Sequence, residues 1–244
     1  EKNIIKYFRS KKNYIFNKLK FIINFFNVND GGYINTNNNI KKDIIIISHL
    51  ANRKQLKHKN DSYFGDIPNL LIEKKYQTLV TYINYLDLGV KSISNEIVND
   101  YQKYILPKKL NVFFELKIFI YILYSWVKFK IIKFSNNIVE KNILDHISSL
   151  KILLSAHTSL RIEKQISMLI NKHDPKIIIC TFEGQPYERI IFGIAKKIKK
   201  NIKCIGYQHT CLTNLQNSIF LNLGEIYNPD IILTTGPINK KIIK

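Results

Sequence analysis

Polar side chains that could carry chemistry gather in two short stretches of this sequence, Thr181–Glu188 and Tyr207–Cys211. Each stretch follows or ends a run of aliphatic residues that is typical of a buried strand. The first contains the carboxylates Glu183 and Glu188, and the second contains the imidazole of His209. A carboxylate close to an imidazole is a common arrangement for proton transfer. We therefore predict an active site on these two stretches.

The two carboxylates differ in their local sequence. Pro186 suits the first position of a helix, which makes Gln185 the N-cap and Glu188 the third helical residue. Glu188 can therefore either cap this helix or contact a substrate. Glu183 precedes a glycine in a loop and has no such capping role, so it is either a solvated loop carboxylate or a functional group. Because loops at the rim of a rigid sheet often carry sites, we favour function.

Other candidates also follow predicted strands, and ligands of open parallel sheets bind beyond the carboxyl ends of the strands. A single histidine such as His209 is either a structural group or a catalyst, and its predicted neighbour Glu183 favours catalysis. Thr234-Thr235-Gly236 could offer backbone N–H groups to an anion. The candidate substrate-binding residues are Glu188, Gln208, Thr210, His49, Thr235 and Gly236.

Several chemistries lack support in the sequence. No GxGxxG, GxxxxGK[ST] or GxSxG motif is present, which argues against nicotinamide, P-loop and serine-hydrolase sites. Cys204, His209 and Cys211 lack the CxxC spacing of a metal site, so we predict buried thiols and no metal. Three cysteines in all indicate reduced thiols in a cytoplasm instead of a disulfide framework.

The elements that must position these residues alternate between strands and helices. Pro186–Lys200 has helical spacing, and Asp66 is placed to cap a helix through Lys75. In Ser94–Asn171, apolar residues recur every three or four positions, so this segment is predicted to be a mostly helical insertion. This order predicts a Rossmann-like α/β domain with a parallel, doubly wound sheet. The predicted strands are Ile44–Ser48, Thr78–Ile83, Ile177–Cys180, Lys203–Tyr207 and Ile231–Leu233.

Residues 1–42 differ from the α/β domain, which we place at 43–244. Ile4–Phe26 alternates apolar clusters with lysines at helical spacing and predicts a basic amphipathic helix. This helix either packs on the domain with its lysines in solvent or contacts a membrane. Asn27–Asn39 is rich in asparagine and glycine and is predicted to be a linker.

The most apolar stretch of the chain is Ile118–Val127, which has ten residues without a charge. A membrane-spanning helix needs about 20 apolar residues, so we predict that Lys117–Lys133 does not cross a bilayer. A core helix and a helix lying in the membrane interface both remain open.

The chain is strongly basic, with 38 Lys and Arg residues against 18 Asp and Glu residues and a net charge of +20. Nucleic acid is one class of partner for such a charge. Only four of the basic residues are arginine, however, and no nucleic-acid-binding motif is present. We therefore predict no nucleic-acid partner and assign the charge to an anionic membrane or an acidic substrate.

Three segments of the sequence carry a resemblance to a known group of proteins. They read TFEGQPYERIIFGIAKK, IGYQHT and NPDIILTTG, and DIIIISHL and SYFGDIPNLL precede them in the same order. Together they resemble bacterial surface-carbohydrate biosynthesis proteins related to Kdo- and sialic-acid-type transferases of the GT-B class. The resemblance covers roughly residues 43–83 and 174–240.

The resemblance implies the N-terminal, mainly acceptor-binding half of a two-domain enzyme, with a C-terminal nucleotide-sugar domain beyond Gly236-Pro237. Its reaction would transfer a sugar from a nucleotide-activated donor, such as a CMP-sugar, to a lipid-linked glycan without a metal. Such enzymes make surface polysaccharide or lipopolysaccharide at the inner face of the cytoplasmic membrane. The chain begins without methionine and ends after a predicted strand, which agrees with a piece of a longer protein.

Within this reading Glu183 is the base that takes the proton of the acceptor hydroxyl. His209 contacts the acceptor or the donor phosphate, and Gln208, Thr210 and Glu188 orient the sugars. The alternative is a non-catalytic, basic α/β binding or scaffold protein at the membrane surface.

Overall fold

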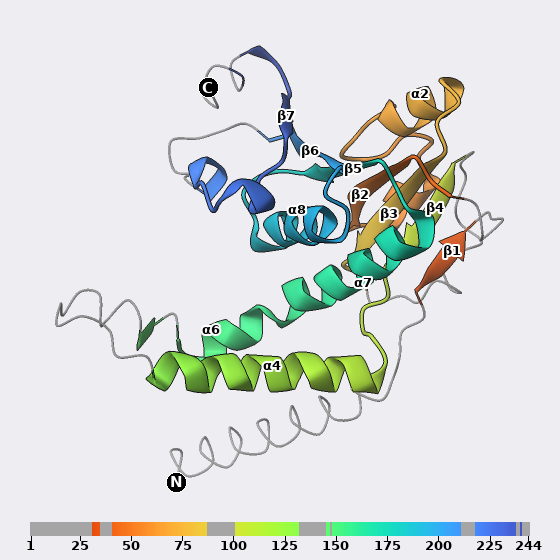
Figure 1. The fold of residues 1–244 in the computed structure, drawn as a ribbon. Helices are drawn as coiled ribbons and strands as arrows, with labels where there is room; N and C mark the ends of the chain where they lie inside the picture. Colours follow the sequence, from red (N-terminus) through yellow and green to blue (C-terminus); the bar gives the residue numbers. More distant parts are fainter. Residues whose placement is uncertain are drawn as a thin grey trace, which may run out of the picture.

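The computed structural model describes residues 31–34, 41–86, 101–131, 145–146, 148–210, 218–237 and 240. These residues form a seven-stranded sheet with helices on both faces (Figure 1). The predicted helix Ile4–Phe26 lies outside them. The strands are β1 (Gly32–Ile34), β2 (Ile44–Leu50), β3 (Thr78–Asn84), β4 (Gln102–Ile105), β5 (Ile177–Thr181), β6 (Lys203–Gln208) and β7 (Ile231–Thr234).

Helices connect these strands. The α-helices are α2 (Ile67–Glu73), α4 (Val112–Ile131), α6 (Leu150–Ser155), α7 (His157–His173) and α8 (Pro186–Ile198). Short 3-10 helices are η1 (Arg53–Lys57), η3 (Ser218–Phe220) and η4 (Glu225–Tyr227). None of the helices among the described residues has the length and hydropathy that crossing a membrane requires.

The sheet has the order β1-β4-β3-β2-β5-β6-β7, and all neighbours are parallel except β1 and β4. Without the antiparallel edge strand β1, this is the strand order of a Rossmann fold. The chain proceeds from β2 toward β4 in one direction and from β5 toward β7 in the other. Its topological switch point therefore lies between β2 and β5, which pair directly.

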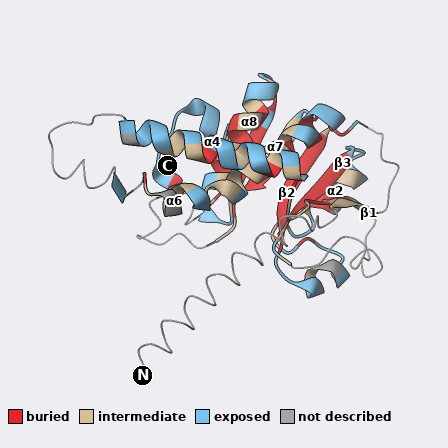
Figure 2. Ribbon diagram, turned by 90° about the horizontal axis from the view of Figure 1, so that it is seen from below, coloured by how far each residue is buried: buried red, intermediate tan, exposed pale blue. Residues whose placement is uncertain are grey.

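The isoleucine run of β2 explains its central position. All seven residues of β2 are buried, because the strand is covered on both faces. Ile45 and Ile47 pack in one cluster with residues of α7 and α8, whereas Ile44 and Ile46 pack in a second cluster with residues of α2. Each fully buried side chain of this size stabilises the fold by roughly 1.5–3 kcal/mol. Figure 2 shows the buried strands between the exposed outer surfaces of the helices.

The five predicted strands are confirmed as parallel neighbours in one sheet, and each extends beyond its predicted end. Each predicted strand ended at or just before a polar residue, but pairing with the neighbouring strand continues through these positions. β2 runs on through His49 to Leu50, and β5 includes Thr181. Two of the candidate polar positions, His49 and Gln208, are thus held by the sheet itself.

The sequence analysis missed two strands. The described part of Ser94–Asn171 is mostly helical, as predicted, but β4 lies near its start. β1 lies within the segment predicted to be a linker, so the linker prediction is wrong there. In β4 the buried residue Lys103 occupies a position where a strand pattern would place an apolar one. Its ammonium lies 4.8 Å from the centre of the Tyr101 ring, and burial lowers the pKa of Lys103 to about 8. In β1, Tyr33 packs on Tyr104 at 4.6 Å between ring centres, a contact that no local pattern reveals.

The helix prediction around Asp66 is correct in position but not in detail. Asp66 is the N-cap of α2, yet its side chain makes no capping hydrogen bond and accepts one from Asn69 instead. α2 ends at Glu73, two residues before the predicted end at Lys75, whose φ is 66°. α8 likewise ends at Ile198 instead of Lys200.

Candidate active site

The switch point between β2 and β5 brings together polar residues at the carboxyl ends of these strands. His49 near the end of β2 lies beside Thr181 at the end of β5, with 3.0 Å between His49 Nε2 and Thr181 Oγ1. The turn after Thr181 carries Glu183 and leads into α8, whose first turn contains Glu188. The crevice at such a switch point is where open α/β sheets bind their ligands.

Glu188 is fully buried and accepts hydrogen bonds from the turn that contains it. Its Oε2 accepts from the backbone N–H groups of Glu183 and Gln185, both at 2.8 Å. Its Oε1 accepts from the Thr181 hydroxyl at 3.0 Å. Burial raises the pKa of Glu188 to about 7, against the lowering effect of these hydrogen bonds. Of its two predicted roles, Glu188 therefore has the capping role. Its carboxylate occupies the N–H groups before α8 that an external anion would otherwise bind.

His49 belongs to the same buried network. Because the Thr181 hydroxyl donates to Glu188, its oxygen accepts from His49, which places a hydrogen on Nε2 of the ring. The hydroxyl of Tyr187 lies 3.3 Å from the same nitrogen and 3.4 Å from Glu188 Oε1. Burial, with a contribution from His209, lowers the pKa of His49 to about 4. The ring is therefore neutral at physiological pH.

Glu183 points instead toward the segment after β6. Its Oε1 accepts from the backbone N–H groups of His209 and Thr210 at 3.2 and 3.1 Å. Its Oε2 accepts from the Thr210 hydroxyl at 2.6 Å. Burial raises the pKa of Glu183, but the contacts with His209 and Thr210 lower it more, so its pKa lies below the ordinary value. The carboxylate is therefore ionised and holds the His209 segment in place.

Glu183 and His209 form a carboxylate–imidazole pair. His209 Nδ1 is buried and lies 3.1 Å from Glu183 Oε1, an ion-pair distance without hydrogen-bond direction. The side chain of His209 is 23% exposed, and that of Glu183 is 12% exposed. Since Nδ1 is buried, the exposed part of the imidazole is the rest of the ring. A partner outside the protein can reach His209 more readily than Glu183.

Aromatic rings join the two polar groups into one site. Tyr63 lies between the imidazoles, with its ring centre 4.9 Å from that of His49 and 5.1 Å from that of His209. Tyr85 and Tyr187 each lie 5.7 Å from His49. Tyr85 is 52% exposed, so the site presents aromatic surface at the rim. Rings and hydroxyls together suit ligands with both apolar and hydroxyl faces, of which sugars are one class.

A buried carboxylate builds the turn that carries Tyr63. Asp61 Oδ1 accepts from the Ser48 hydroxyl on β2 and from the backbone N–H groups of Tyr63 and Phe64, all at 2.9 Å. The turn closes through two backbone hydrogen bonds between Asp61 and Gly65. β2 thus positions His49 through its backbone and Tyr63 through Ser48.

Gly184 allows the turn after Glu183 to form. Its φ is +80°, and a Cβ there would lie 2.4 Å from the backbone carbon of Ser218. Ser218 in turn donates its hydroxyl to the carbonyl of Glu183 at 3.0 Å. Arg189 on α8 fixes the same segment by donating to the Ser218 carbonyl at 2.7 Å and to Asn228 Oδ1 at 2.5 Å.

The remaining predicted residues lie one strand further along the sheet. Gln208 is fully buried, and its side-chain amide donates to the Thr210 carbonyl. The N–H groups of the predicted anion-binding turn donate to carbonyl groups of the protein itself. Thr235 donates to the Gln208 carbonyl at 3.2 Å, and Gly236 donates to the Thr234 carbonyl at 3.0 Å. Gln208 and Thr210 therefore support the site, whereas Thr235 and Gly236 close the end of β7.

The sequence did not single out Tyr63, Tyr85 or Tyr187. Tyr85 could have been found from the sequence, because it directly follows a strand, β3, as His209 follows β6. Tyr187 is next to Glu188 in the sequence but reaches the site only through the turn into α8. Tyr63 lies 13 residues beyond the end of β2, and only the turn built by Asp61 returns it to the sheet.

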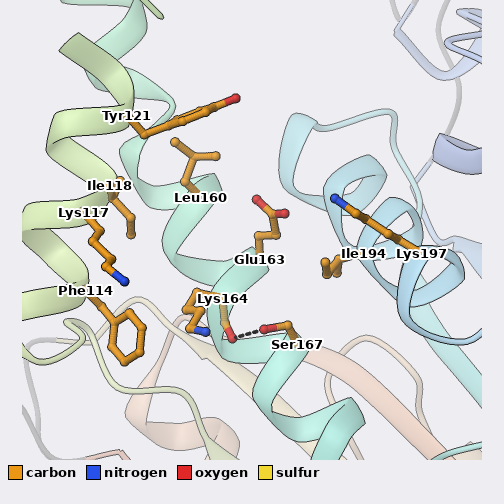
Figure 3. A pocket seen from close by; sticks show the side chains of 10 residues that line it. All are labelled: Phe114, Lys117, Ile118, Tyr121, Leu160, Glu163, Lys164, Ser167, Ile194 and Lys197. Atoms are coloured by element: carbon orange, nitrogen blue, oxygen red, sulfur yellow. Dashed lines mark hydrogen bonds between the residues drawn. The ribbon is translucent and has the colours of Figure 1, made fainter. Parts of the chain in front are cut away.

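One cleft borders this site, and a second lies elsewhere on the molecule. One of about 290 Å³ includes Tyr85 and Arg161 and opens beside the ends of β3 and β4. A larger one of about 530 Å³ lies between α4, α7 and α8, away from the rim (Figure 3). Cys204 lies in the apolar core, and no cluster of possible metal ligands occurs in the described part of the chain.

No protein-family model matches the chain, and no curated protein matches it significantly.

Proposed function

We propose that the chain is the acceptor-binding part of a glycosyltransferase that moves a sugar from a nucleotide-activated donor to a glycan acceptor in the cytoplasm. The observation that carries the proposal is the Glu183–His209 pair, which lies beside Tyr63 at the carboxyl ends of β5 and β6, next to the switch point of a Rossmann-like sheet. The motif resemblance of the segments around Glu183 and His209 supports the same activity.

The geometry leads us to exchange the roles that the sequence assigned to the pair. Both carboxylate oxygens of Glu183 already accept hydrogen bonds, and its lowered pKa makes it a weak base. His209 has the more exposed side chain, so we assign to it the removal of the acceptor hydroxyl proton. Glu183 is then a positioning residue that holds the ring and balances the positive charge of the imidazolium.

In the proposed reaction, the acceptor oxygen bonds to the anomeric carbon while the bond from that carbon to the donor phosphate breaks. The hydroxyl proton passes to His209, and the nucleotide leaves with its phosphate. The exposed ring of Tyr85 and the half-buried ring of Tyr63 offer apolar faces against which a sugar can stack. The buried His49–Thr181–Glu188 network keeps these rings in place without taking part in proton transfer.

The test measures nucleotide release from a panel of CMP-, UDP- and GDP-sugars in the presence of glycan acceptors. With the full-length gene product, His209→Asn should lower kcat by about 10²–10⁴-fold, the usual contribution of a positioned base. Glu183→Gln should lower kcat less and leave KM for the donor unchanged. His146→Asn, at an exposed histidine outside the site, is the matched control.

Two outcomes would contradict the proposal. An unaffected kcat in His209→Asn would remove the assigned base. Saturable binding of glycans without turnover of any donor would favour the non-catalytic binding protein instead.

A further inference from the structure

The outer face of α4 is apolar, and none of the helices and strands that the structure describes packs on it. α4 lies on the side of α7 away from the sheet (Figure 1), and it packs against α6 and α7. Large apolar side chains recur on its outer face three or four residues apart, which places them in one stripe. They are Phe113, Leu116, Ile120, Tyr124, Val127 and Ile131, with exposed fractions of 61, 48, 55, 64, 46 and 72%.

The charges around this stripe have one sign. Lys117 and Lys128 are exposed along its edge. Glu115, the acidic residue of α4, is 3% exposed and points inward, where it forms an ion pair with Arg161 at 2.7 Å. The apolar stripe is therefore bordered by positive charge and by no negative charge of its own helix.

The cleft of Figure 3 adds positive charge to the same edge. It opens between α4, α7 and α8, and Lys117, Lys164 and Lys197 line it together with the apolar Phe114 and Tyr121. A single carboxylate, Glu163, faces these lysines from α7. In a lipid bilayer, phosphate groups lie beside an apolar layer. The lysines could contact such phosphates while the stripe contacts the apolar layer.

We propose that the outer face of α4 is a docking surface for an anionic lipid bilayer, with the helix lying in the plane of the interface. Exposed Phe, Ile, Leu and Tyr side chains would enter the boundary between headgroups and acyl chains, and the lysines would contact lipid phosphates. The inference goes beyond the proposed function and does not depend on it.

Charge favours the bilayer over two protein occupants. A second copy of α4 would bring Lys117 and Lys128 against the same lysines. The segment Ile4–Phe26 contains lysines and an arginine but no acidic residue, so it offers no complement either. An anionic lipid surface supplies both an apolar layer and negative charge.

Vesicle flotation of the full chain tests the proposal without any sugar. The protein should float with vesicles of phosphatidylcholine and phosphatidylglycerol and remain mostly unbound with phosphatidylcholine alone. Ile120→Asp should lower the partition coefficient by roughly tenfold or more, because it removes an apolar group and adds a repelled charge. Leu70→Asp, on α2 at the opposite face of the sheet and 47% exposed, is the matched control and should bind as the wild type does.

The lysines are tested separately. Lys117→Gln and Lys128→Gln should each lower binding to the anionic vesicles by about fivefold. The exposed residues Lys74 and Lys200 serve as controls in the same substitution. A Trp126→Phe/Tyr124→Trp variant places the chain's single tryptophan in the stripe, and its emission should shift to shorter wavelength with anionic vesicles.

Three outcomes would overturn the proposal. The first is equal flotation of wild type and Ile120→Asp. The second is a dimer in sedimentation velocity that Ile120→Asp dissociates. The third is a large loss of melting temperature in Ile120→Asp with unchanged vesicle binding, which would mean that another part of the chain covers α4.

Discussion

Two carboxylates near the N-terminus of α8, Glu183 before the helix and Glu188 in its first turn, lie five residues apart and have opposite environments. Glu188 is fully buried, faces its own turn and has a raised pKa. Glu183 faces the segment that follows β6, contacts the partly exposed His209 and has a lowered pKa. The same residue type therefore stabilises the scaffold in one position and organises a candidate reactive group in the other. The difference lies in the hydrogen-bond donors, which are local for Glu188 and come from residues 209 and 210 for Glu183.

The largest effect that this contrast predicts is on stability. Glu188→Ala would leave the N–H groups of Glu183 and Gln185 and the Thr181 hydroxyl without their acceptor. Each buried donor left unsatisfied costs about 1–3 kcal/mol, so the free energy of unfolding should fall by about 3 kcal/mol or more. Urea denaturation measures it, with Glu73→Ala at an exposed position of α2 as the control. A loss below about 0.5 kcal/mol, the size of ordinary surface effects, would mean that Glu188 does not seal the turn.

The pH dependence of stability should separate the two carboxylates next. The pKa of Glu188 rises from 4.5 to about 7 on folding, so the folded state takes up a proton that the unfolded state has lost. Stability from Glu188 is therefore greatest below pH 4.5 and falls by about 3 kcal/mol as the pH rises through 7. Glu183 acts in the opposite sense, because its lowered pKa gives stability that is lost in acid.

Urea denaturation at several pH values between 4 and 8 can show which carboxylate causes each change of stability with pH. Glu188→Gln should flatten the fall of stability toward pH 8, whereas Glu183→Gln should change only the acidic end. If Glu188→Gln keeps the wild-type slope, another group titrates in this range and the contrast between the carboxylates is lost.

A smaller effect concerns Gly184, which separates the two carboxylates in the turn. Gly184→Ala combines a strained φ of +80° with a backbone contact at 2.4 Å, so we expect a loss of roughly 2–3 kcal/mol. Gly65 also has a positive φ, +58°, but nothing lies within 4 Å of a Cβ there. Gly65→Ala should therefore cost only about 1 kcal/mol of strain. Equal melting temperatures for the two variants would show that the close approach to Ser218 has no effect.

The sequence by itself determined the central sheet and the edge at which polar residues gather. Isoleucine runs such as that of β2 must be buried on both faces, and this requirement predicts a parallel sheet with helices on each side. Pro186 and Glu188 at the start of α8 likewise predicted capping as one of the two roles of Glu188, the other being substrate contact. This was possible because the capping hydrogen bonds join residues that are close in the sequence.

Only the tertiary structure decided the other features. β1 and β4 are short, and their strand conformation depends on pairing with each other and with β3. The direction of the Glu183 side chain depends on N–H groups 26 and 27 residues away, and Tyr63 reaches the site through a turn held by Asp61. Contacts between distant segments leave no periodic pattern in the sequence. For that reason the sequence predicted that Glu183 and His209 lie at one edge of the sheet, while packing decided which hydrogen-bond donors the Glu183 carboxylate meets.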